Sequence, residues 1–270
     1  MDAPPQNKPF AWQPLTPAGV AAFATASLSR LFTVQLVVAL LAAAVVVWFL
    51  QAAWFPLVTA AIRQLPDQGR IRAGQLEWPG SSPVVLAQGH FLAVTVDLNH
   101  EGEARSPAHV QVEFGRSDFK IFSLLGYLQG QYPRRWLIAF NRPELLPWWG
   151  AWSPALLALA AGATIAGLLL AWAVLATLYS VPAWLLAFFA DRDLHWRGSW
   201  RLAGAALLPG ALLMTGAVFL YGLGGLDLVQ LAFTAALHLL VGWVYLFASP
   251  FWLPRHPAAP GAGANPFTKA

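Results

Sequence analysis

The sequence of 270 residues contains no cysteine and few charged residues. Without cysteine the chain has no disulfide, no thiolate nucleophile, no thiolate metal ligand and no lipid-modified cysteine. Charged residues make up 10% of the chain, against roughly 25% in an ordinary soluble domain, and 58% of the residues are hydrophobic. Most of the chain therefore need not face water, and the composition predicts an integral membrane protein.

Several functional motifs are also missing. We find no glycine-rich phosphate loop, no Gly-x-Ser-x-Gly elbow and no paired carboxylates in an apolar setting. The net charge is +4, but the 16 lysine and arginine residues are scattered and form no basic run. We therefore expect no enzyme, no cofactor and no nucleic-acid partner, and a lipid bilayer as the surroundings of the chain.

The first long apolar run is free of charge from residue 31 to residue 62. Because about 20 apolar residues cross the hydrocarbon core of a bilayer, this run is long enough for a transmembrane helix. A cleaved signal peptide has an apolar region of about 7–15 residues behind a short basic start. The run is longer and starts deeper in the chain, so we predict a retained helix.

Charge is absent again from residue 145 to residue 190, a length far greater than a bilayer is thick. We therefore expect the second helix to end or kink at Ser180–Pro182, because the residue before a proline disfavours the helical conformation. Residues 182–190 then form a short interfacial or re-entrant helix, within an interfacial segment 182–201. The spans predicted after the first lie at about 153–179, 202–221 and 229–251.

Between the first two helices, residues 63–147 have the pattern of a small strand-rich domain. Residues 92–98 and 110–114 alternate between apolar and polar side chains, which predicts two half-buried strands. The polar residues 99–107 between them predict a hairpin loop. Weaker strand candidates are Ile71–Trp78, Val84–Gln88, Phe119–Phe122 and Trp136–Phe140, and Leu124–Leu128 is a candidate short helix.

The predicted fold is an α-helical bundle of about four transmembrane helices with an inserted extracytoplasmic β-rich domain, all-β or α+β. Lysine and arginine favour the cytoplasmic side of short loops, and the short loop 222–228 contains neither. We therefore expect both termini in the cytoplasm and the domain outside. The predicted organisation is a tail at 1–30, a first helix at 31–62, the domain at 63–147, three further helices within 148–254 and a tail at 255–270.

The fourth predicted helix carries a polar stripe. Such a stripe inside a membrane helix is expected to face the bundle rather than lipid. His238 lies near mid-membrane, so one hypothesis is a proton relay or a small polar pathway. Hydrogen bonding between helices is the favoured interpretation, because no charged residue accompanies the histidine. At helical spacing the stripe comprises Gln230, Thr234, His238, Gly242, Tyr245 and Ser249.

The second predicted helix carries small residues at small-xxx-small spacing, which lets helix backbones approach closely. The motif predicts packing within the chain or self-association through this helix. The two sets are Ala158, Gly162 and Ala166, and Ala163, Gly167 and Ala171.

Tryptophan is abundant, with 14 residues. Tryptophan favours the membrane–water interface, where its ring is apolar and its N–H can bond. A haem site at 147–152 is a weaker interpretation, because axial histidines and the longer motif of such sites are missing. The candidate membrane-interface anchors are Trp48, Trp54, Trp148, Trp149, Trp152 and Trp252.

Two groups of residues raise the question of a metal site. The first is His90, His100 and His109 with Glu101 and Glu103, but the His-Glu-Gly-Glu string lacks the second histidine of a zinc-protease helix, and we favour a solvated hairpin. The second is the run 191–195, with two aspartates and a histidine, for which a charged helix flank is the simpler interpretation. We therefore predict no metal site.

Residues 126–127 and 131–133 are candidates for a ligand-facing edge, although turn chemistry explains them equally well.

The order of the parts, with the motif Ile71-Arg-Ala-Gly74-Gln-Leu76 as a strand in the external domain, resembles a bacterial membrane-protein family of unknown function. That family has one helix, an external domain and then three or more helices. The resemblance implies a bacterial cytoplasmic membrane with the domain outside, and it supplies no functional residues.

Together these features favour a non-enzymatic accessory or scaffold component, whose external domain binds a protein partner in the bacterial envelope. An exposed strand edge is a surface that such a domain can use. A small transporter or channel-like component using the polar face of the fourth helix is the alternative. A membrane-embedded enzyme is third.

Overall fold

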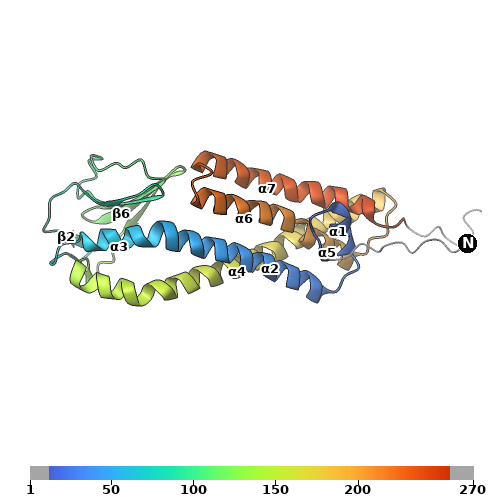
Figure 1. Cartoon of the computed structure of the whole chain (residues 1–270), viewed down its shortest axis with the longest axis horizontal. Helices are drawn as coiled ribbons and strands as arrows, with labels where there is room; N and C mark the ends of the chain where they lie inside the picture. The colour runs from blue at the N-terminus through green and yellow to red at the C-terminus, as the bar shows by residue number, and fades with distance from the viewer. Residues whose placement is uncertain (1–11, 256–270) are drawn as a thin grey trace, which may run out of the picture. The chain divides into compact units, whose positions relative to one another are not determined.

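The computed structural model describes residues 12–255, which fold as two compact units (Figure 1). The first unit takes its described residues from the parts of the chain up to Ala42, from Thr164–Ala217 and from Leu231 onward. The second comprises Ala43–Ala163 and Val218–Gln230. Four helical runs are long and apolar enough to cross a membrane, as predicted, and they are Leu28–Arg63, Arg142–Phe189, Trp196–Gly222 and Leu228–Trp252.

The first helical run is continuous from α2 to α3. A π-helical turn, η1, precedes Pro56, which lacks the N–H that would continue the regular ladder. The helical elements are α1 Pro17–Ala22, α2 Leu28–Phe49, η1 Leu50–Trp54, α3 Phe55–Arg63, α4 Arg142–Phe189, α5 Trp196–Ala206, α6 Leu208–Gly222, α7 Leu228–Ala248 and η2 Ser249–Trp252.

The start of the second helix differs from the prediction. We expected about residue 153, but α4 begins at Arg142. Asn141 caps it, since its Oδ1 accepts the N–H of Glu144 at 3.0 Å while its Nδ2 donates to the Glu144 carboxylate at 3.1 Å. The first bond satisfies one of the backbone donors that a helix start leaves open, and the second holds the Glu144 side chain against the cap.

The predicted end of that helix is wrong as well, because α4 runs unbroken through Ser180 and Pro182 to Phe189. There is no separate helix at 182–190, and residues 196–201 belong to α5. The Oγ of Ser180 donates to the Thr177 carbonyl at 2.8 Å in the turn before the proline. Packing of one face outweighs the lost backbone bond, because fully buried residues lie on both sides of the proline: Ala176, Ser180, Ala183 and Ala187.

The described part of the predicted N-terminal tail is folded. The Oγ1 of Thr16 accepts the N–H of Gly19 at 3.0 Å and caps α1. Val20 and Phe23 are fully buried, so an apolar pair ties this segment to the first unit. The remaining parts of the two predicted tails, 1–11 and 256–270, lie outside the described residues.

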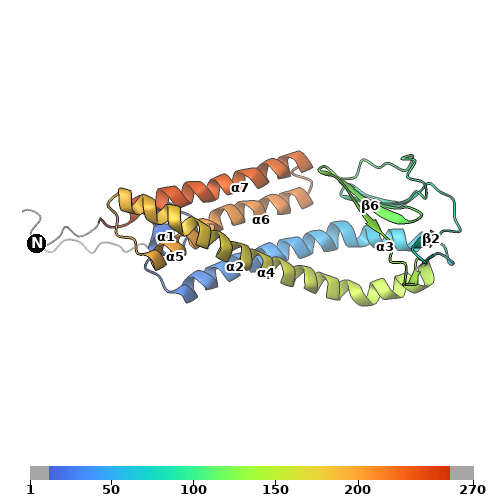
Figure 2. The same cartoon turned by 180° about the vertical axis from the view of Figure 1, so that it is seen from behind.

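The second unit contains a mixed sheet of order β3-β4-β5-β6-β7 and a small sheet of order β2-β1-β8 (Figure 2). β4 pairs with β5 in parallel, and the other pairings are antiparallel. The strands are β1 Arg70–Arg72, β2 Gln75–Glu77, β3 Val84–Gln88, β4 Leu92–Val96, β5 Val110–Phe114, β6 Asp118–Ser123, β7 Gly126–Gln131 and β8 Ile138–Ala139.

The structure corrects three of the predicted strand elements. Because β4 and β5 are parallel, the polar segment 97–109 is a crossover that returns along the sheet, not a hairpin loop. The predicted strand Ile71–Trp78 is a hairpin, since Ala73 and Gly74 both have positive φ and form a tight turn between β1 and β2. Leu124–Leu128 is not a helix: two of its residues form the turn between β6 and β7, and the rest begin β7.

Both faces of the large sheet are covered. The apolar face, which carries Leu92, Val94 and Val96, packs with α3 in one core cluster. The opposite face is polar, yet Thr95, Gln111 and Glu113 are buried there because the crossover folds over them. The predicted half-buried state of residues 92–98 is therefore wrong for β4, which is buried on both faces.

Candidate functional site

β7 is the last strand of the large sheet, and one side of its backbone is open. Because a two-residue turn joins β6 and β7, the backbone groups of Gly126, Leu128 and Gly130 point toward β6 and bond with it. The next residue of this alternating series, Tyr132, also bonds on that side, since its N–H donates to the Ser117 carbonyl at 3.3 Å. The N–H and C=O groups of the alternate residues therefore point away from β6. The outward groups are those of Tyr127, Gln129 and Gln131, and they have no backbone partner within residues 12–255.

The side chains of this edge are uncharged and exposed. β7 reads Gly-Tyr-Leu-Gln-Gly-Gln, and it has neither the charge nor the proline that commonly protects an edge strand from pairing with another chain. Leu128 is 73% exposed, and Leu125 at the adjoining turn is 96% exposed. The opposite edge strand differs, since β3 packs against α3 and contains a bulge.

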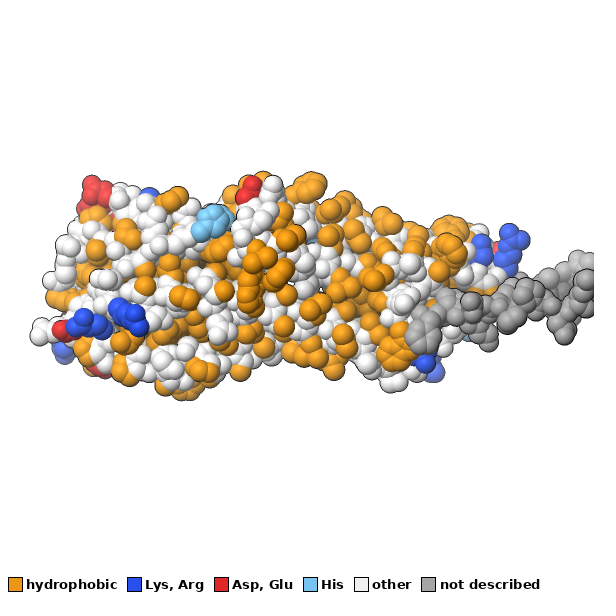
Figure 3. Space-filling model, viewed as in Figure 1, with side chains coloured by type: hydrophobic (Ala, Val, Ile, Leu, Met, Phe, Trp, Pro, Cys, Tyr) orange, Lys and Arg blue, Asp and Glu red, His pale blue; other side chains and the backbone are white. Residues whose placement is uncertain are grey.

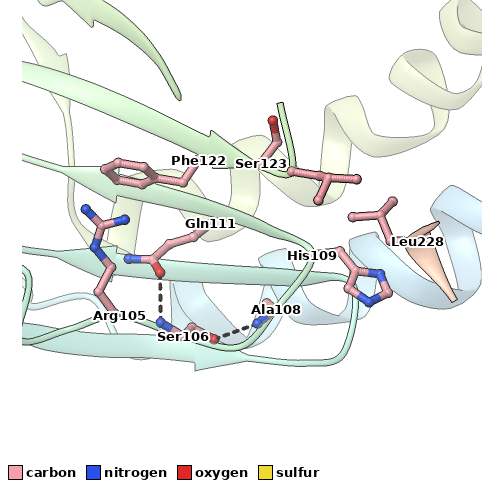
Figure 4. A pocket seen from close by; sticks show the side chains of 9 residues that line it. Arg105, Ser106, Ala108, His109, Gln111, Phe122, Ser123 and Leu228 are labelled. Atoms are coloured by element: carbon pink, nitrogen blue, oxygen red, sulfur yellow. Dashed lines mark hydrogen bonds between the residues drawn. The ribbon is translucent and has the colours of Figure 1, made fainter. Parts of the chain in front are cut away.

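A pocket of about 280 Å³ lies beside this hairpin on the polar face of the sheet (Figure 4). The guanidinium of Arg105 stacks 3.8 Å from the centroid of the Phe122 ring, and the Phe122 ring lies 5.7 Å from that of Tyr127. The Nζ of Lys120 is 5.9 Å from the Tyr127 ring. Basic and aromatic side chains thus lead from the pocket to the open edge. The pocket is lined by Arg105, Ser106, Ala108, His109, Gln111, Phe122, Ser123, Leu124 and Leu228.

A buried polar cluster fastens the crossover to the sheet next to this pocket. The imidazole of His100 lies between two carboxylates, with Nδ1 2.5 Å from Glu113 Oε1 and Nε2 3.1 Å from Asp118 Oδ1. Gln129 Nε2 donates to the other Asp118 oxygen at 2.5 Å. Burial lowers the pKa of His100, but the two carboxylate hydrogen bonds outweigh it and raise that pKa above its ordinary value. The cluster therefore stabilises the protonated imidazole.

The three histidines considered for a metal site do not converge in the structure. His100 is held by Glu113 and Asp118, while the rings of His90 and His109 lie 4.4 Å apart elsewhere. The favoured solvated hairpin is also wrong for His100, whose side chain is only 17% exposed. Glu101 accepts the Asn99 side-chain amide at 3.0 Å. Between residues 12 and 255, no group of three or more histidine or acidic side chains is arranged so that it could hold a metal ion, in the run 191–195 or elsewhere.

The crossover contacts the end of α6, which no sequence pattern predicted. His109 Nδ1 lies 2.6 Å from the Tyr221 hydroxyl, and the two rings stack at 5.5 Å. The ring of Phe91 lies 4.9 Å from that of Tyr221. Burial, followed by the nearby His90, lowers the pKa of His109, so a neutral imidazole is favoured in this contact.

The polar stripe of α7 lies mainly on the less exposed side of that helix. Gly242 and Ser249 are buried, Thr234, His238 and Tyr245 are half-buried, and Gln230 is exposed. Three side chains of this stripe bond backbone carbonyls. His238 bonds the Ala235 carbonyl of its own helix, Tyr245 donates to the Leu15 carbonyl at 2.6 Å, and Ser249 donates to the Tyr245 carbonyl at 2.6 Å.

The predicted tryptophan anchors divide into two groups. Trp148, Trp152 and Trp252 are exposed. The other three are half-buried: Trp48 packs 5.0 Å from Phe219, Trp54 joins the core between α3 and the sheet, and Trp149 donates to Thr59 at 3.0 Å.

The small-residue motif of α4 faces away from the rest of the chain. The surroundings of Gly162 and Gly167 are open, with no atom close to where a side chain would lie. All six residues of the motif are exposed: Ala158, Gly162, Ala163, Ala166, Gly167 and Ala171.

In comparisons with known proteins, no family model matches the chain, and neither a curated protein nor a solved structure shows a significant match. The family resemblance drawn from Ile71–Leu76 therefore stays a prediction. The fold itself defines a class of protein, a chain with four helices of membrane-spanning length and composition and a β-sheet unit whose outer edge strand is open.

Proposed function

We propose that this chain is a non-enzymatic accessory component of a bacterial cytoplasmic membrane. In this proposal the sheet lies outside the cytoplasm and binds a protein partner, which adds a β-strand along β7. The observation that carries the proposal is the uncharged, exposed edge of β7, with outward backbone groups at Tyr127, Gln129 and Gln131. Strand addition supplies main-chain hydrogen bonds to such an edge, and the alternating side chains supply selectivity.

The placement in a membrane is supported by the surface of the helices. On the face drawn in Figure 3, hydrophobic side chains cover the helical surface, which is unfavourable in water and suited to lipid. Large exposed apolar residues on the four candidate spans include Leu40, Leu170, Leu220 and Phe233.

The surroundings of β7 suit a partner strand better than a small reactant. The acidic side chain nearest the edge, Asp118, is engaged by His100 and by the Gln129 amide. They hold the sheet and its crossover in shape. The exposed side chains of β7 suit those of an extended peptide, and they are Tyr127, Leu128, Gln129 and Gln131. A transport role for α7 has less support, because the side chains of His238 and Ser249 both bond carbonyls of their own helix.

Site-specific photo-crosslinking in cells tests this proposal. We expect a crosslinker at Gln131 to form an adduct with a discrete partner. A crosslinker at Val85, which is 42% exposed on the opposite edge strand, is expected to form none. A pair of substitutions separates main-chain pairing from side-chain contact. Tyr127→Pro removes one outward N–H and leaves the β6 ladder in place, whereas Tyr127→Ala keeps that N–H.

The Gln131 adduct is expected to persist in Tyr127→Ala and to disappear in Tyr127→Pro. Equal adduct formation in both variants would exclude strand addition. Repeated recovery of the protein without any adduct from either edge would exclude a partner at this sheet altogether.

A further inference from the structure

A second surface lies in the other unit, where α2 and α5 begin. It is a cavity of about 430 Å³ between the first turn of α2 and the side of α5. The cavity is lined by Leu28, Phe32, Trp196, Arg197, Trp200 and Arg201.

The position of this cavity along the helices is informative. Leu28 is the first residue of one candidate membrane span, and Trp196 is the first residue of another. Because both spans begin beside the same cavity, helices that cross a bilayer would hold it at the depth of the lipid headgroups. Tryptophan and arginine are enriched at that depth.

The sequence of α5 explains how the cavity is built. Residues four apart share a face of a helix, so Trp196 and Trp200 form one stripe and Arg197 and Arg201 form the next. The opposite side of α5 is buried, with Leu202 among the residues that are fully covered. The Nε1 of Trp200 donates to Thr177 at 3.1 Å, which fixes that ring at one wall.

The charge of the cavity is of one sign. Its lining holds two arginines and no acidic side chain. Arg201 Nη2 donates to the Ala24 carbonyl at 2.6 Å, but its Nε is buried and has no acceptor among the described residues. A buried donor without an acceptor is unfavourable, so this arginine suits an anionic acceptor. Arg197 is exposed at the same cavity.

We propose that this cavity binds one anionic phospholipid. The lipid phosphate accepts hydrogen bonds from Arg197 and Arg201, since a guanidinium presents paired donors that match phosphate oxygens. The upper part of an acyl chain lies along Leu28, Phe32 and Trp196, which form the apolar wall. The inference rests on the membrane placement proposed above and does not depend on a partner strand at β7.

Native mass spectrometry of the full-length protein tests the proposal, with phosphatidylglycerol and phosphatidylcholine as the two lipids. We expect retention of one phosphatidylglycerol and much weaker retention of phosphatidylcholine. Arg197→Gln is expected to weaken phosphatidylglycerol binding about fivefold, which is the usual effect of one basic residue near an anionic membrane surface. This variant leaves the bond between Arg201 and Ala24 in place, and its melting temperature checks that it folds. The matched control is Arg135→Gln, which removes an exposed charge from the sheet unit and is expected to change nothing.

Equal retention of the two lipids, or equal effects of Arg197→Gln and Arg135→Gln, would overturn the proposal. Displacement of phosphatidylglycerol by millimolar inorganic phosphate would also overturn it, because the cavity would then be an anion site rather than a lipid site. A failure of crosslinking at β7 leaves these outcomes unaffected. Recovery of the protein in the soluble fraction of cells, and not with the membranes, would overturn both proposals.

Discussion

The imidazole Nδ1 of His100 lies 2.5 Å from the Oε1 of Glu113, beneath the crossover that covers the polar face of the sheet. This pair joins a loop residue to β5, and Asp118 on β6 holds the other ring nitrogen. The shape of the surface beside β7 therefore depends on the protonation of one histidine.

The first prediction is a pH dependence of stability that His100 controls. Its folded-state pKa is raised above the ordinary 6.5, so its stabilising effect is complete below that pH and is lost as the pH rises through the raised value. The pKa of Asp118 is lowered below the ordinary 3.8, so its contribution is lost only as the pH falls through that lower value. The thermal midpoint of the wild-type protein should thus fall as the pH rises from about 6.5 toward 9. The midpoint of His100→Asn should change less over the same range, and parallel curves for the two proteins would contradict the assignment.

The second prediction concerns Glu113, whose side chain is 1% exposed. Glu113→Ala removes one of the two carboxylates that hold the His100 imidazolium and one acceptor of the Gln111 amide. It should destabilise the protein by about 3 kcal/mol. Glu113→Gln keeps one acceptor oxygen and should cost less. Glu103→Ala, an exposed glutamate in the same crossover, serves as the control and should stay within about 0.5 kcal/mol of wild type. Denaturant unfolding measures all three; equal values for the two alanine variants would show that the pair is not structurally important.

The third prediction tests the contact between His109 and Tyr221. Tyr221→Phe removes the hydroxyl that lies 2.6 Å from His109 Nδ1 but keeps the ring stacked at 5.5 Å. The expected loss is about 1 kcal/mol, because one hydrogen bond of this kind contributes about that much. It should appear as faster amide exchange at the end of the crossover, around residues 106–110. Tyr127→Phe changes an exposed tyrosine and should leave those amides unchanged.

The sequence was sufficient for elements that depend on neighbouring residues. Long charge-free runs predicted the apolar helices, and the alternation at 110–114 predicted β5 at its observed bounds. The weaker candidate Val84–Gln88 is β3 at the same bounds. Helical spacing also grouped Thr234, His238 and Tyr245 on one side of α7.

The missed features depend on residues that are distant in the sequence. The parallel pairing of β4 and β5 is set by strand order, and that order also decides that β7 is the open edge. Residues 126–127 and 131–133 had been weighed as an edge, but nothing local distinguishes an edge strand from a central one. Likewise, Gln111 and Glu113 read as solvent-facing because the crossover that buries them cannot be recognised from alternation alone.

The last prediction concerns Pro182, where the sequence indicated a helix end and the structure has none. Proline within a helix is less favourable than alanine by about 3 kcal/mol, since it lacks an N–H and crowds the preceding turn. At this position the missing bond would reach the Leu178 carbonyl. Neighbouring residues already hold the helix in place, because Ser180 and Ala183 are fully buried.

Pro182→Ala should therefore raise the thermal midpoint of the detergent-purified protein. Pro143→Ala is the matched control, because Pro143 is the second residue of α4, where an N–H has no acceptor within the helix and proline is well tolerated. If Pro182→Ala gave no more stability than Pro143→Ala, the backbone at Pro182 would already be free of strain. A lower midpoint would mean that the buried face around Ser180 packs only with the helix geometry that the proline imposes.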